Sequence, residues 1–125
     1  MSISIYVDDS DVIHFLQGQN DILTMAETTD EKSGRMQIIL SGKLNHDTVP
    51  GFCDELSALI SVKEKITLDM KNLTYIDPSG ISTLVRLQQQ IEQMNPEEYL
   101  LLTSVPEAIE NSFKKVGATD LLVIQ

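Results

Sequence analysis

The spacing of hydrophobic residues changes abruptly near residue 77. Before it, Ile66, Leu68 and Met70 alternate with Thr67 and Asp69, which is the period of a β-strand. After it, apolar or inward-facing positions recur at helical spacing. These positions are Ile81, Leu84, Val85, Gln88 and Ile91. The pattern therefore predicts a buried strand, a tight polar corner and a helix.

Strands and helices alternate along most of the chain. The pattern predicts strands near 22–26, 36–40, 66–70, 99–103 and 121–124, and helices near 48–60, 78–91 and 105–116, with a polar turn at 27–34. The first two strands form an antiparallel hairpin. Strands that alternate with helices predict a mixed, largely parallel sheet of the α/β class with right-handed crossovers. Such a sheet places the corners at 45–48 and 77–80 on the same edge.

Residues 1–19 form a short N-terminal extension before this alternation, and residues 20–125 form one domain. Ile3, Ile5 and Val7 alternate as in a short strand, and the acidic run at 8–11 is typical of the start of a brief helix over 12–16. His14 lies in that apolar segment without another ligand at metal-site spacing. We expect a surface or edge histidine there and no metal site or cofactor.

The corner at 77–80 carries the most specific local chemistry. Asp77 is a favoured N-cap, and Pro78 suits the first helical position, where a missing N–H costs nothing. Ser79 then lies in the first turn, at the positive end of the helix dipole. Gly80 costs about 0.5–1 kcal/mol in a helix relative to Ala, which indicates close approach of another group. The alternative interpretation is a plain helix cap with Ser79 as a solvated surface residue.

Two further polar or reactive groups have simpler interpretations. Asn45, His46 and Asp47 crowd the other strand-to-helix corner, where capping is their expected role. Cys53 falls in the apolar stripe of the 48–60 helix without a neighbouring basic residue in the sequence, and is interpreted as a small core side chain.

The net charge of the chain argues against two classes of partner, nucleic acids and anionic membranes. The 125 residues carry 9 basic and 19 acidic side chains, a formal charge of -10. A field of that sign repels nucleic acids and anionic membranes. No apolar run is long enough for a membrane span and no export leader is recognisable. A single cysteine fits a reducing cytosol, so a cytoplasmic protein is expected.

The order of elements and four segments resemble the STAS domain, the sulphate transporter and anti-sigma factor antagonist fold. The segments are GKLN at 42–45, ITLDM at 66–70, DPSGI at 77–81 and FKKVG at 113–117. The resemblance spans about residues 20–125. Three features depart from many members: Pro78 replaces a small residue, a final helix is not expected after the last strand, and residues 1–19 are additional.

The resemblance to stand-alone bacterial members implies a function in signal transduction. In those proteins the serine of the corner is phosphorylated by an anti-sigma factor that is also a serine kinase, and a serine phosphatase reverses the reaction. Ser79 is then the phosphoacceptor of an anti-sigma factor antagonist that regulates transcription by partner switching. Asp77, Pro78, Gly80 and Asn45 are the residues expected to contact the partner.

Two other functions compete with this one. The first is a non-phosphorylated STAS docking subunit of a transporter ATPase or a sensory complex. The second is an enzyme, which we do not expect because Ser79 and Asp77 lack a base with a third orienting group in the sequence and no glycine-rich phosphate loop is present.

Overall fold

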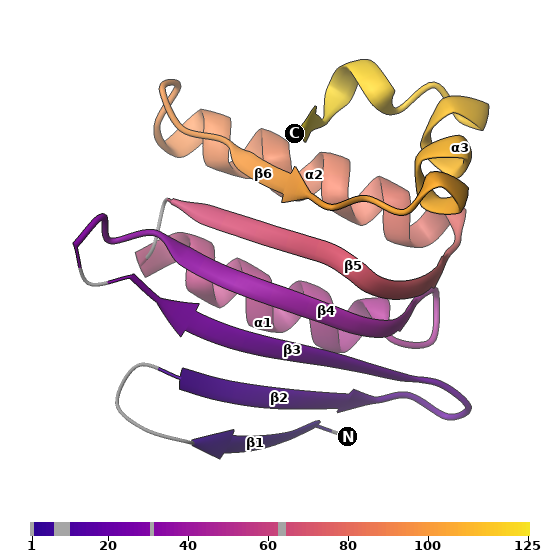
Figure 1. Cartoon of the computed structure of the whole chain (residues 1–125), viewed down its shortest axis with the longest axis horizontal. Coiled ribbons are helices and arrows are strands. Elements are labelled where there is room, and N and C mark those ends of the chain that lie inside the picture. Colours follow the sequence, from indigo (N-terminus) through magenta and orange to yellow (C-terminus); the bar gives the residue numbers. More distant parts are fainter. Residues whose placement is uncertain (1, 7–10, 31, 63–64) are drawn as a thin grey trace.

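Seven strands in one sheet and three α-helices make up the fold (Figure 1). The computed structural model of the chain describes residues 2–6, 11–30, 32–62 and 65–125. The strands are β1 (Ser2–Tyr6), β2 (Asp11–Gln17), β3 (Ile22–Thr29), β4 (Met36–Leu44), β5 (Ile66–Ile76), β6 (Leu100–Thr103) and β7 (Val123–Ile124). The helices are α1 (Val49–Val62), α2 (Pro78–Met94) and α3 (Glu107–Lys115), with a 3₁₀ turn at Thr119–Leu121.

The order of the strands in the sheet is their order in the sequence. The pairs from β1 to β4 are antiparallel, and the pairs from β4 to β7 are parallel. Right-handed crossovers that always step in one direction place their helices on one face, and α1 and α2 both lie behind the sheet in Figure 1. The predicted mixed α/β sheet with parallel crossovers is confirmed.

Residues 11–17 form strand β2, so the helix expected over 12–16 is wrong. His14 and Leu16 are buried on the helix-covered side and pair with Met25 and Leu23 of β3, so the expected surface or edge position of His14 is also wrong. The alternation was obscured because a polar side chain, His14, occupies a buried position, and because pairing with β3 outweighs local capping preferences. The predicted short N-terminal strand is present over residues 2–6, whereas Val7, Asp8, Asp9 and Ser10 lie outside the described residues.

Three smaller differences remain, two in the ends of strands and one in the burial of a side chain. Strand β3 continues through Glu27 to Thr29, a stretch expected to be a turn, and Glu31 of that turn lies outside the described residues. The segment before the last strand is a 3₁₀ turn, so β7 is shorter than expected. Cys53 is half-buried rather than a core residue, and its Sγ accepts a hydrogen bond from Arg86 Nη2 at 3.4 Å.

One hydrophobic core fills the space between the sheet and its helices. Leu68 in β5 lies between the neighbours Ile38 of β4 and Leu102 of β6, and all three are fully buried. Phe113 of α3 is buried in the same cluster.

Within the described residues, no helix has the length and apolar composition required to cross a membrane.

Leu68→Ala and Phe113→Ala should each lower the free energy of unfolding by about 2–5 kcal/mol, because each removes fully buried atoms and leaves a cavity. Urea unfolding followed by circular dichroism measures this. Gln89→Ala, at an exposed position of α2, is the matched control and should change stability by less than about 0.5 kcal/mol. A cost for Leu68→Ala as small as for the control would contradict the packing described here.

Candidate functional site

Three turns meet at one end of the sheet and form the corner site. They are the β2–β3 turn at 18–21, the β4–α1 corner at 45–48 and the β5–α2 corner at 77–80. Figure 1 shows that the carboxyl ends of β4 and β5 and the turn from β2 to β3 lie at the same end of the molecule. The two strand-to-helix corners therefore lie side by side, as the sequence predicted.

The carboxylate of Asp77 joins the two corners. Its Oδ1 accepts hydrogen bonds from Ser79 Oγ at 2.7 Å and Gly80 N at 2.9 Å. Its Oδ2 accepts from His46 N at 2.9 Å and lies 3.5 Å from His46 Nδ1. Asp77 is thus the N-cap of α2 and also a link to the neighbouring corner, and Pro78 begins the helix as predicted.

Burial alone would raise the pKa of Asp77, but hydrogen bonds from Ser79, Gly80 and His46 together outweigh that effect and lower the pKa below its usual value. The side chain is therefore ionised at neutral pH. Its negative charge lies at the start of α2, where the helix dipole favours an anion.

Ser79 lies in the first turn of α2 and is half-buried. Its hydroxyl donates to Asp77, and its backbone carbonyl accepts from Thr83 Oγ1 at 2.8 Å. The strands built from the first seventeen residues lie at the opposite edge of the sheet from α2 (Figure 1). The described strands β1 and β2 therefore do not cover Ser79.

Gly80 is buried, and the group that approaches it is the end of strand β4. A Cβ at this position would lie 2.6 Å from Leu44 O and 2.9 Å from Ile76 Cγ1. The same carbonyl of Leu44 accepts a hydrogen bond from Asp77 N at 3.2 Å. The close approach expected at Gly80 is real, but its cause is the packing of this chain against itself.

Asn45 is only 5% exposed, and its side chain holds the β4–α1 corner. Its Nδ2 donates to Asp21 Oδ2 at 2.9 Å, while its Oδ1 accepts from Asp47 N and Thr48 N at 3.1 and 3.3 Å. Asn45 thus holds the 45–48 turn that leads into α1, whereas Asp47, also expected to cap, binds the β2–β3 turn with its carboxylate. A side chain so enclosed shapes the surface around it and offers little area of its own to a partner.

Asp47 fixes the β2–β3 turn, a role that sequence reasoning missed. Its carboxylate accepts three backbone N–H groups, from Gln19, Asn20 and Asp21, at 2.7–2.8 Å. The bonds from Asn20, Asp21 and Gln19 lower the pKa of Asp47. The only sequence signal was a carboxylate beside a helix start. Spacing along the chain does not predict the contact, because Asp47 and its partners are 26–28 residues apart.

A hollow of about 740 Å³ adjoins the corner site. It is lined by the β2–β3 turn and the first turn of α1, including Gln19, His46, Asp47, Pro50 and Asp54. The imidazole of His46 is 83% exposed and lies between this hollow and Asp77. A partner that contacts the start of α2 can therefore also reach the hollow.

A family model described as "Mlab, STAS domain" matches residues 27–124. The chain belongs to the STAS domain family. The match leaves out β1, β2 and most of β3. Among the curated proteins, no similar sequence is found.

Solved structures of anti-sigma factor antagonists share the STAS fold of this chain. One from Mycobacterium paratuberculosis matches with a TM-score of 0.71 at 13% identity, over 82% of this chain and 84% of that chain. SpoIIAA in its unphosphorylated form gives 0.60 at 18% identity, over 73% and 79%. The Bacillus protein SpoIIAA in its phosphorylated form gives 0.61 at 16% identity, over 81% and 90%. At such identities the likeness establishes the fold.

The polar groups of this STAS corner are not arranged as a hydrolytic triad. In a triad the histidine lies between serine and the acid, so that it can take the hydroxyl proton. Here Asp77 lies between Ser79 and His46. The arrangement orients the Ser79 hydroxyl, whose proton points to the carboxylate of Asp77. It does not supply the histidine base that activates serine for acyl transfer in a triad.

Gly80→Ala should destabilise the protein by about 1–3 kcal/mol, because the added methyl group collides with a backbone carbonyl that cannot rotate away. Gly51→Ala is the matched control, since Gly51 is also the third residue of its helix but has ordinary contacts of 3.4 Å or more with Leu16. It should be neutral or stabilising by up to about 1 kcal/mol. Thermal unfolding of both variants distinguishes close packing at Gly80 from a general helix-propensity effect.

Asp47→Asn should destabilise the protein near neutral pH, and the difference from the parent should shrink on acidification. The lowered pKa means that folding favours ionised Asp47, so its contribution is present above the ordinary carboxyl range and is lost as the pH falls through and below it. Urea unfolding at about pH 7 and about pH 3 measures the effect. Asp54→Asn, an exposed neighbour on α1, controls for the charge change. A pH-independent loss in Asp47→Asn would contradict the assignment.

Proposed function

We propose that this protein is an anti-sigma factor antagonist controlled by phosphorylation of Ser79. In its unphosphorylated form it binds an anti-sigma factor that is also a serine kinase. A serine phosphatase removes the phosphate and restores the form that binds. Such a cytoplasmic partner switch regulates transcription without catalysing a reaction itself. The observation that carries the proposal is the hydroxyl of Ser79, placed in the first turn of α2 and bonded to Asp77 at 2.7 Å.

The contact with Asp77 supports phosphoryl transfer to this serine. The carboxylate is ionised at neutral pH and accepts the Ser79 proton in its hydrogen bond, so it fixes the direction of the hydroxyl. A kinase that docks on the start of α2 meets an oriented oxygen rather than a freely rotating one. Pro78 is exposed at the same turn and offers a rigid apolar contact to such a partner.

Phosphorylation would change the charge of the corner without removing what holds it together. A phosphoserine carries a charge of about -1.5 to -2 near neutral pH, and its bridging oxygen can no longer donate to Asp77. Asp77 retains its bonds from Gly80 N and His46 N, so α2 keeps its cap. The exposed imidazole of His46 is close enough to Asp77 to offer a compensating positive charge when it is protonated.

The expected consequence lies at the partner's surface. The corner site already contains Asp21, Asp47 and Asp77 in a chain whose net charge is -10. A further dianion there repels an acidic partner and covers the apolar ring of Pro78 with a hydrated group. Loss of binding through repulsion and desolvation therefore fits this scaffold better than refolding of the domain.

A docking subunit of a transporter ATPase or a sensory complex is the second candidate. Its support is that Ser79 is half-buried rather than fully exposed. The corner around it is held by contacts within the chain, since Gly80 packs on Leu44 and Asn45 is enclosed. A corner that serves only for packing against a permanent partner would have these contacts too. The two functions differ in whether phosphate is ever transferred to Ser79.

Incubation with the cognate anti-sigma kinase and ATP should add one phosphoryl group, as seen by intact-mass spectrometry. Ser79→Ala should abolish the addition, whereas Ser82→Ala, at an exposed serine one turn along the same helix, should not. Ser79→Asp should remain folded and bind the kinase at least about tenfold more weakly, which corresponds to about 1.4 kcal/mol of repulsion. Phosphate on another residue, or unchanged affinity of a folded Ser79→Asp, would favour the docking function.

A further inference from the structure

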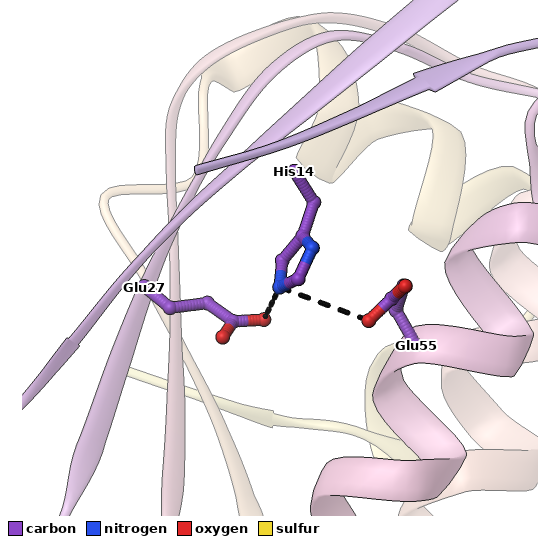
Figure 2. Close-up of side chains that lie close together, drawn as sticks. All are labelled: His14, Glu27 and Glu55. Atoms are coloured by element: carbon purple, nitrogen blue, oxygen red, sulfur yellow. Dashed lines mark ion pairs between the residues drawn. The ribbon is translucent and has the colours of Figure 1, made fainter. Parts of the chain in front are cut away.

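A second polar cluster lies between the sheet and α1, apart from the corner site. It consists of His14 on β2, Glu27 on β3 and Glu55 on α1, and is called the His14 cluster below (Figure 2). Figure 2 shows the imidazole pointing from the sheet toward the helix, with one carboxylate on either side. Nothing in the proposed phosphorylation switch uses these residues.

The distances within the His14 cluster are those of atoms around a common centre. His14 Nε2 lies 2.9 Å from Glu27 Oε1 and 3.7 Å from Glu55 Oε2, and the three ligand atoms are all within 4.8 Å of one another. A tetrahedral Zn²⁺ with bonds of about 2.0–2.1 Å holds neighbouring ligand atoms about 3.3 Å apart. The two separations from His14 Nε2 lie on either side of that value, so the three side chains are within reach of one ion. Within the described parts of the chain, no other three His, Cys, Asp or Glu side chains converge in this way.

Glu27 is the unusual member, because it is an acidic residue at a core position. It is 5% exposed, and within the described residues its Oε1 accepts no backbone amide and lies 2.9 Å from His14 Nε2. Burial raises the pKa of Glu27, and the neighbouring His14 opposes that effect. A carboxylate so enclosed requires a positive charge beside it, from a proton or from a metal ion.

Ser4 orients the imidazole of His14 from the opposite side. Ser4 and His14 are directly paired across β1 and β2, and Ser4 Oγ lies 2.7 Å from His14 Nδ1. When Nδ1 carries the ring proton, it donates to Ser4 and leaves the lone pair of Nε2 directed at Glu27 and Glu55. Metal-binding histidines are commonly held in this manner by a second group on the other ring nitrogen.

We propose that the His14 cluster binds one divalent transition-metal ion, with Zn²⁺ as the best fit, through His14 Nε2, Glu27 and Glu55. An imidazole with two carboxylates favours zinc and its neighbours over Mg²⁺ or Ca²⁺, which prefer sites made of oxygen ligands alone. Glu55 is 29% exposed, so it marks the side from which the ion enters and where a fourth ligand from solvent binds.

The bound ion would join three elements of the fold, two neighbouring strands and a helix. It would tie β2 to β3 and to α1, and so anchor the N-terminal strand pair to the rest of the domain. The inference does not depend on the phosphorylation proposal, because Ser79 and Asp77 take no part in it. A metal that stabilises this edge acts on the protein in either phosphorylation state.

Zinc titration of the chelator-treated full chain by calorimetry tests the proposal. We expect one Zn²⁺ per chain and a higher melting temperature with the metal. Glu55→Gln, at the solvent side, should weaken binding at least about tenfold. Asp54→Asn, the adjacent exposed carboxylate, and His46→Gln, the other histidine, are matched controls and should change affinity less than about twofold. Equal binding in Glu55→Gln and the parent, or loss of binding in His46→Gln, would overturn the site.

Histidine NMR of the parent protein avoids any dependence on how variants fold. Added Zn²⁺ should shift the Nε2 resonance of His14 and leave His46 unchanged. Co²⁺ in place of Zn²⁺ should give the intense visible absorption of a tetrahedral site. A His14 ring that stays doubly protonated in the presence of Zn²⁺ would mean that an imidazolium, rather than a metal ion, neutralises Glu27.

Discussion

The carboxylate of Asp77 is the constraint on which the corner site depends. One side chain caps α2, orients the Ser79 hydroxyl and accepts the amide of His46 from the neighbouring corner. This junction is possible only because β4 and β5 are adjacent parallel strands whose ends meet at one edge of the sheet. The close approach of Leu44 O to Gly80 then fixes the distance between the two corners. Fold and site are therefore determined by the same few contacts.

Negative charge is the main electrostatic feature of the corner site. Backbone amides lower the pKa of Asp47, and at Asp77 the Ser79 hydroxyl with the amides of Gly80 and His46 outweighs the opposing effect of burial, so both carboxylates are ionised over the physiological range. Hydrogen bonds from the chain itself stabilise these anions, and a partner must contribute the rest of the complementarity. The His14 cluster follows the opposite principle, because its buried Glu27 lacks such amide donors and depends on a cation. The two clusters therefore differ in how their negative charge is balanced.

Local signals in the sequence predicted the central part of the fold and failed where contacts are distant. The change of period at residue 77, with Asp77 and Pro78 as cap and first helical residue, is decided within a few positions, and the structure agrees. The strand at 11–17 was missed because His14 interrupts its apolar alternation and only pairing with β3 resolves the ambiguity. The bonds of Asp47 to residues 19–21 and the meeting of Glu27 with Glu55 join separate elements, which spacing along the chain does not encode.

The sequential order of the strands has a consequence for how the molecule forms. Within the described residues every strand pairs only with the strands that precede and follow it in the chain. The antiparallel partners β2, β3 and β4 are joined by short turns, whereas the parallel partners from β4 to β6 are separated by a whole helix. Short turns keep loop-closure costs small, and pairing across a helix is slower. The hairpins of the antiparallel half are therefore expected to form before the parallel crossovers.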